Sequence, residues 1–124
     1  FIKIKGDTEK ALEKSGKALQ EYTYFSMRRQ AYSTWRNILE ESLVRAATIC
    51  YLIDHDYDEK DIRNAIIEQV DRNFFWMPEL VQTLRYYESH RKKYPTFTSF
   101  YPEIIRFFDR YVADVEKEIQ KALK

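Results

Sequence analysis

The sequence contains few of the residues that interrupt regular structure. Only two glycines and three prolines occur in 124 residues, whereas these two residue types together make up about 12% of an average protein. So few of them leave little room for the tight turns of a β-rich fold, which favours helices. The single cysteine, Cys50, excludes an intramolecular disulfide framework and a cysteine-rich zinc site. Its apolar neighbours predict a buried, unreactive thiol.

An excess of one charge and a long apolar run are also absent. The chain has 21 Lys and Arg against 20 Asp and Glu, a net charge of +1. Nucleic-acid binders normally carry a basic excess, and a membrane-spanning helix needs a run of about 18 apolar residues. We therefore expect no nucleic-acid partner and no membrane span. The length and the 44% apolar content predict that residues 1–124 form a single helical domain, or a subdomain of a larger one.

Common catalytic motifs are missing as well. The sequence has no P-loop, no GxGxxG and no GxSxG. Neither His55 nor His90 begins an HExxH motif, and two histidines without a partner at i+4 do not make a typical zinc site alone. His90 also lacks the glutamate three residues earlier that a di-iron bundle uses. Aspartates flank His55, and this segment has two interpretations. In one the aspartates hold a cation, and in the other they belong to a solvated loop between two helices. We interpret the segment as the loop.

Apolar spacing predicts an all-α fold of about five helices. Residues 1–5 alternate apolar and basic side chains, which indicates one short N-terminal strand. Residues 96–101 are expected to form an aromatic-rich link. Residues 7–25 carry apolar side chains at helical spacing, including Phe25. The predicted helices begin at Asp7 or Thr8, at Ser33 or Thr34, at Asp58, at Pro78 and at Pro102.

The segment 34–53 is predicted to be the central helix, around which the others pack. It is apolar on nearly all sides, which is typical of a helix in the middle of a domain. Leu43, Ala46 and Ile49 should accordingly be buried. At 100° per residue, one polar stripe falls within a sector of about 80°. Its members are Thr34, Asn37, Glu41, Arg45 and Thr48.

This stripe has two interpretations. In the first, Glu41 and Arg45 form an ion pair on a solvated helix edge, which contributes about 0.2–0.5 kcal/mol. In the second, the stripe lines a cleft, and Glu41 is a metal ligand or a base that its neighbours orient. The spacing alone leaves both interpretations open.

Three stretches of the chain, taken together and in this order, resemble a known family. That family consists of bacterial proteins catalogued as a domain of unknown function, and its members look like zinc-dependent metallopeptidases of the gluzincin type. The resemblance covers roughly residues 25–110 and concerns the C-terminal half of the family's domain. The stretches are Gln30–Trp35 leading into Glu41–Ala46, then Phe75–Leu80, then Tyr94–Pro102.

The resemblance implies a role for Glu41. In gluzincins an HExxH helix supplies two histidine ligands and the catalytic glutamate, and a glutamate on a later helix completes the zinc site. Glu41 matches that later glutamate, whereas Glu40 lies about 100° away around the helix and is the weaker candidate. The HExxH helix would lie upstream of Phe1, so zinc is expected only in a longer protein, and this chain alone would hold no cofactor and be inactive. The residues expected to surround Glu41 are Asn37, Arg45, Thr48 and Tyr32.

Partners and location follow from the same resemblance. The remainder of a longer chain, or a second copy, would cover an exposed apolar face of this helical unit. Export to the periplasm or the cell surface is the implied location. The alternative hypothesis is a stand-alone helical interaction module without catalytic activity, whose aromatic and arginine side chains form a partner surface.

Overall fold

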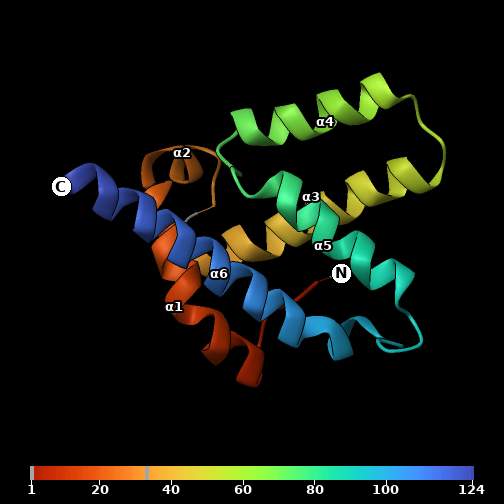
Figure 1. Ribbon diagram of the computed structural model, residues 1–124, viewed down its shortest axis with the longest axis horizontal. Helices are drawn as coiled ribbons and strands as arrows, with labels where there is room; N and C mark the ends of the chain where they lie inside the picture. Colours follow the sequence, from red (N-terminus) through yellow and green to blue (C-terminus); the bar gives the residue numbers. More distant parts are fainter. Residues whose placement is uncertain (1, 33) are drawn as a thin grey trace.

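The computed structural model describes residues 2–32 and 34–124, and this part of the chain contains six α-helices and no strand (Figure 1). The all-α fold predicted from the sequence is therefore confirmed. None of these helices combines the length and the apolar character needed to cross a membrane. The helices are α1 (Gly6–Tyr22), α2 (Tyr24–Arg29), α3 (Trp35–Asp54), α4 (Glu59–Asp71), α5 (Met77–Ser89) and α6 (Phe97–Leu123).

Helix α3 lies at the centre of the fold, as predicted. It packs against α1, α4 and α5, and Leu43 and Ala46 are completely buried while Ile49 is 2% exposed. The helix begins after Thr34, whose hydroxyl accepts a hydrogen bond from the backbone N–H of Asn37 at 3.1 Å. This N-cap satisfies one of the amides that a helix start leaves unpaired. The other predicted cap, Ser33, lies outside the described residues.

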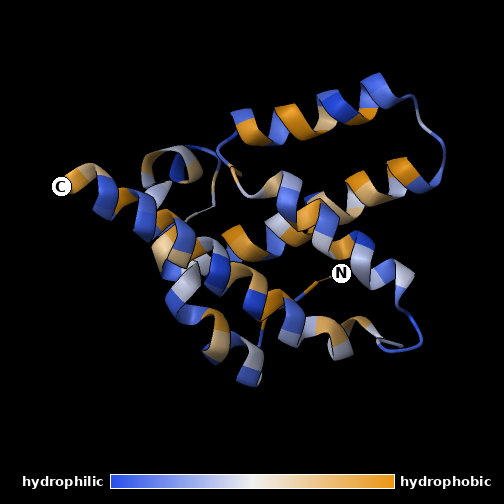
Figure 2. Ribbon diagram, in the orientation of Figure 1, coloured by the Kyte–Doolittle hydropathy of each residue, from blue (hydrophilic) through white to orange (hydrophobic). Residues whose placement is uncertain are grey.

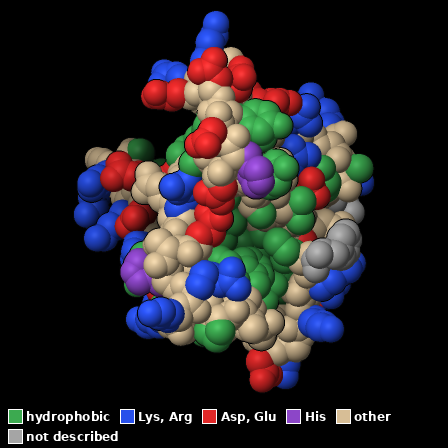
Figure 3. All heavy atoms as spheres, turned by 90° about the vertical axis from the view of Figure 1, so that its right-hand side faces the viewer, with side chains coloured by type: hydrophobic (Ala, Val, Ile, Leu, Met, Phe, Trp, Pro, Cys, Tyr) green, Lys and Arg blue, Asp and Glu red, His purple; other side chains and the backbone are tan. Residues whose placement is uncertain are grey.

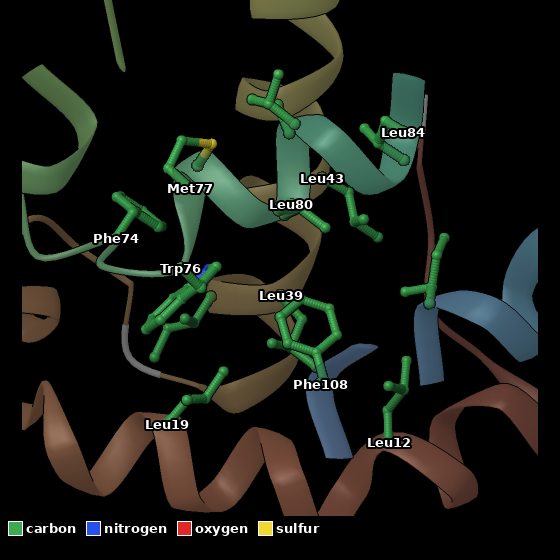
Figure 4. Close-up of a cluster of buried hydrophobic side chains, with 14 of the residues drawn as sticks. Leu12, Leu19, Leu39, Leu43, Phe74, Trp76, Met77, Leu80, Leu84 and Phe108 are labelled. Atoms are coloured by element: carbon green, nitrogen blue, oxygen red, sulfur yellow. The ribbon is translucent and has the colours of Figure 1, made fainter. Parts of the chain in front are cut away.

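The core is a continuous cluster of aliphatic and aromatic side chains between α3 and the helices around it (Figure 4). One polar arrangement lies inside it. The indole Nε1 of Trp76 donates to the hydroxyl of Ser42 at 2.9 Å, and that hydroxyl donates to the carbonyl of Ile38 at 2.6 Å. The buried polar groups are thereby paired, as a core requires. Fully buried members of the core include Leu12, Leu19, Leu39, Leu43, Phe74, Leu80 and Phe108.

Helices α1 and α6 run side by side and in parallel. The hydroxyl of Ser15 donates to Asp109 at 2.5 Å, and seven residues further along both helices the hydroxyl of Tyr22 donates to Glu116. The apolar stripe of α6 turns toward the core and its polar side faces outward (Figure 2). The last turns of α6 extend beyond the end of α1 (Figure 1), and Leu123 is 74% exposed.

Two predictions for the N-terminal part are wrong. Residues 2–5 form no strand: the backbone N–H of Ile4 donates to the carboxylate of Glu40 at 2.7 Å, so a helix side chain pairs with this segment. The predicted first helix is divided at Thr23, whose hydroxyl bonds the carbonyl of Leu19. The separate helix α2 follows, and Phe25, expected on an inner face, is 82% exposed.

The start of the last helix was also predicted wrongly. Helix α6 begins at Phe97 and not at Pro102, because Thr96 and Ser99 form a reciprocal capping box. Pro102 lies inside the helix. It lies in the second turn, where its missing N–H leaves the carbonyl of Thr98 without a helical partner. The aromatic segment predicted as a link is therefore the first turn of α6.

Candidate functional site

One side of α3 remains accessible to solvent although the helix is central. Val44 is 37% exposed and Tyr51 is 54% exposed on this side. Two neighbouring clefts lie along it, with volumes of about 730 Å³ and about 680 Å³, and they share Ile2, Lys3 and Ala47. On the face shown in Figure 3, hydrophobic side chains gather in a hollow that charged side chains border. The most buried helix of the fold therefore also presents an accessible side with two clefts.

The first cleft, which we call the Glu41 cleft, collects most of the polar stripe. Asn37, Glu41 and Thr48 line it from α3, and Tyr32 lines it from the preceding loop. Arg45 does not line the cleft but is bonded to Glu41. The structure thus brings together all the residues that the sequence singled out around Glu41.

Arg45 is held from four sides. Its Nε donates to Glu41 Oε1 at 3.0 Å, one terminal nitrogen donates to Gln69 Oε1 at 2.7 Å, and the other donates to the Tyr32 hydroxyl at 2.8 Å. The guanidinium also lies 5.0 Å from the ring centroid of Phe74. The Arg45 side chain is 18% exposed and that of Glu41 is 32% exposed. Arg45 therefore links α3 to α4 and fixes the orientation of Glu41.

The neighbouring carboxylate, Glu40, serves a different purpose. It lines the same cleft but accepts the hydrogen bond from the backbone of Ile4. The hydroxyl of Tyr101 donates to the carbonyl of Lys3 at 3.4 Å on the same stretch. Side chains from α3 and α6 therefore hold the extended N-terminal residues between the two clefts.

The described residues do not form a complete metal site. Among them, no group of three or more His, Cys, Asp or Glu side chains is placed to hold a metal ion. His55 stacks on Tyr51 and His90 stacks on Tyr86, each with ring centroids 3.9 Å apart, and both histidines are exposed. Glu41 can accordingly offer one ligand, and the remaining ligands would have to come from outside this part of the chain.

The second cleft, which we call the Glu88 cleft, was not anticipated from the sequence. Cys50 of α3 and Glu88 of α5 line it together. Burial raises the pKa of the Cys50 thiol to about 12, consistent with the predicted unreactive cysteine, which is 4% exposed. Burial and a hydrogen bond with Asp54 raise the pKa of the Glu88 carboxyl to about 7. The apolar wall of the Glu88 cleft consists of Leu84, Tyr87, Phe97 and Tyr101.

No signal in the sequence connects the residues of the Glu88 cleft. They come from the N-terminal segment, α3, α5 and α6, and only tertiary packing joins them. Gln69, which holds Arg45 from α4, was missed for the same reason. Glu88 and Gln69 each look like an ordinary helix-surface residue when their own helix is considered alone.

Comparison with known proteins identifies the family. Residues 5–107 match the family described as Domain of unknown function (DUF4932). The chain belongs to the DUF4932 family. The match spans α3 with Glu41 and Arg45 as well as Glu88, and the family's description names no activity. No curated protein and no solved structure matches this DUF4932 chain.

Proposed function

We propose that this DUF4932 chain is the C-terminal helical part of a gluzincin-type, zinc metallopeptidase-like protein, and that Glu41 contributes one zinc ligand. The other ligands would come from an HExxH helix outside residues 1–124. The observation that carries the proposal is the placement of Glu41, which reaches into a cleft from the most buried helix of the fold. The isolated chain is then inactive, because it holds one ligand out of three.

The anchoring of Glu41 supports this role. A metal ligand works best on a rigid element, with a partner that fixes its orientation. Helix α3 supplies the rigid element, and Arg45 supplies the partner through its bond to Oε1 of Glu41. Tyr32 and Gln69 in turn hold Arg45. An isolated surface ion pair would not need these two additional bonds.

The charge arrangement supports it as well. Arg45 neutralises Glu41 within the protein, so the helical part is stable without a metal ion. A zinc ion brought to the cleft by two histidines would meet a carboxylate that is already oriented. Zinc sites of the catalytic type use three protein ligands and leave one position open for water.

The test requires the longer natural protein that contains an HExxH segment upstream. Zinc affinity is measured by competition with a chromophoric chelator, and helicity is measured by circular dichroism. Glu41→Gln should weaken zinc binding by about tenfold or more without a change in helicity. Glu68→Gln is the matched control, because Glu68 also pairs with an arginine four residues later but lies on α4. Normal zinc binding by Glu41→Gln, or no zinc binding by the longer protein, contradicts the proposal.

The second candidate function is a stand-alone helical interaction module. Apolar side chains exposed on α3 and in the loop before α5 favour it, among them Val44, Tyr51 and Phe75. In this case a partner protein or a second copy would cover the accessible side of α3. Mass spectrometry of the native protein separates the two candidates. A longer protein with HExxH upstream supports the peptidase-like role, and a native N-terminus at Phe1 supports the interaction module.

A further inference from the structure

The Glu88 cleft has the shape and the walls of a small-molecule site. Its volume of about 680 Å³ lies within the range of about 300–1,000 Å³ that is common for ligand pockets. Tyr87 and Phe97 meet edge to face with centroids 5.5 Å apart, and Phe97 meets Tyr101 at 5.3 Å. These ring contacts hold the apolar wall in place. A ligand that fits here has an apolar body.

Positive charge also lines this cleft. Lys3 and Lys5 line it from the extended N-terminal segment. Thr8 lines it from the first turn of α1, a helix start that no side chain of the described residues caps. Thr98 lines it from the first turn of α6. A helix N-terminus carries partial positive charge and unpaired N–H groups, so the start of α1 and the two lysines favour an anion, whereas the start of α6 is closed by its capping box.

Negative groups near the cleft oppose part of this field, and Asp7 and Glu9 lie in the first turn of α1 itself. Asp54 lies 3.6 Å from Arg85 in an ion pair. In the first turn of α1, Glu9 accepts a bond from Arg36 at 2.7 Å. Glu88 itself has a pKa raised to about 7, so its carboxyl is largely neutral below that pH. Two lysines and this one carboxyl line the cleft, so the lining carries a net positive charge in either protonation state of Glu88.

We propose that the Glu88 cleft binds a small apolar carboxylate, with the apolar body against Leu84, Tyr87 and Phe97 and the carboxylate beside Lys3 and Lys5. This binding site is separate from the proposed role of Glu41. The two clefts meet at the N-terminal segment, but the ligand of the Glu88 cleft needs neither zinc nor an upstream helix. The proposal therefore stands or fails independently of the proposed function.

A matched series of probes tests the choice of head group. Octanoate, octanol and octylammonium share one apolar body and differ in charge, and their binding to the 124-residue chain is measured by calorimetry and by NMR shift changes. We expect octanoate to bind at least tenfold more tightly than the other two, with shifts at Ala47, Leu84 and Thr98. Equal binding of octanol, preference for octylammonium, or no binding of octanoate overturns the proposal. Binding only of a peptide through its C-terminal carboxylate overturns the small-acid assignment.

Variants locate the site. Lys5→Gln should weaken octanoate binding about two- to fivefold, as expected for the loss of one exposed charge, whereas Lys10→Gln, on the exposed side of α1, should not change it. Thr98→Trp should block the cleft and reduce binding at least tenfold. Circular dichroism checks that this variant remains helical, and Gln82→Trp, an exposed position on α5, is its control. Unchanged binding in both Lys5→Gln and Thr98→Trp excludes this cleft.

The pH dependence provides a second check. The groups that act on Glu88 are Asp54 and Cys50 of α3 and Arg85 of α5, and Lys3 and Lys5 line the same cleft. As the pH rises from 6 to 8, Glu88 loses its proton and adds a negative charge to the cleft that holds the bound anion. Octanoate binding should therefore weaken over this range in the original chain and remain nearly constant in Glu88→Gln. An identical pH profile in both proteins contradicts the placement of the ligand in the cleft that Glu88 lines.

Discussion

Arg45 donates to Glu41 one turn earlier on α3, Nε to Oε1 at 3.0 Å, and the same guanidinium reaches Gln69 on α4 at 2.7 Å. The i,i+4 pair that the spacing predicted is therefore part of a larger group of hydrogen bonds. An exposed pair of this kind contributes little to stability. Here the arginine also joins two helices and donates a hydrogen bond to the Tyr32 hydroxyl. The orientation of Glu41 is therefore coupled to the packing of the fold.

The first prediction concerns the loss of this arginine. Arg45→Met keeps the aliphatic contacts but leaves Glu41, Gln69 and Tyr32 without their donor. We expect the free energy of unfolding to fall by about 1–3 kcal/mol, because partly buried polar groups lose their partner. Urea denaturation measures the change. Arg72→Met is the control, since its pair with Glu68 is exposed and should contribute about 0.5 kcal/mol or less; equal losses in both variants would show that Arg45 is an ordinary surface residue.

The second prediction concerns the buried bond between Ser42 and Trp76. Ser42→Ala removes the acceptor of the indole N–H, and an unpaired buried donor costs about 1–3 kcal/mol. Thr48→Ala is the matched control, because its hydroxyl is exposed and bonds only the carbonyl of Val44 in the same helix. In a Trp76→Phe background the cost of Ser42→Ala should shrink, since no indole donor remains. An undiminished cost in that background would assign the effect to packing and not to the hydrogen bond.

The third prediction concerns the close approach of α1 to α3 at Gly16. A Cβ built on Gly16 would lie 2.3 Å from Cε3 of Trp35, far too close for an unshifted structure. Gly16→Ala gains about 1 kcal/mol of helix propensity but should still lower the melting temperature, because overpacking costs about 1–3 kcal/mol. Trp35→Leu in the same chain should relieve the clash and reduce the loss. A Gly16→Ala variant that melts at a higher temperature would contradict the close packing.

The fourth prediction concerns the pH dependence of stability through Glu88. Its folded pKa is raised from 4.5 to about 7 by burial and by the bond with Asp54. The folded state then holds the proton more tightly than the unfolded state, so the contribution is present below about pH 4.5 and is lost as the pH rises through about 7. Glu88→Gln should flatten the decrease in stability over this window, measured by denaturation at several pH values. Glu59→Gln, on the exposed first turn of α4, should leave the decrease unchanged.

The positions of most helices could be predicted because their signals are local. The cap at Thr34 and the apolar spacing of 34–53 depend on residues within a few turns of one another, and both predictions are confirmed. The predicted start of α6 is wrong because proline is common at the first helical position, which favours Pro102 when only the local sequence is considered. The capping box of Thr96 and Ser99 places the beginning about one and a half turns earlier, at Phe97.

The grouping of the site residues shows the same division between local and tertiary information. Periodicity at 100° per residue placed Asn37, Glu41, Arg45 and Thr48 on one side of a single helix, and that result followed from the sequence by itself. Only the tertiary structure decided that Gln69 and Tyr32 hold Arg45, and that Glu88 meets Asp54 and Cys50 in a cleft that two lysines also line. The reason is physical: a helical period orders the side chains within one helix, whereas contacts between helices depend on how their surfaces pack, which no local pattern encodes.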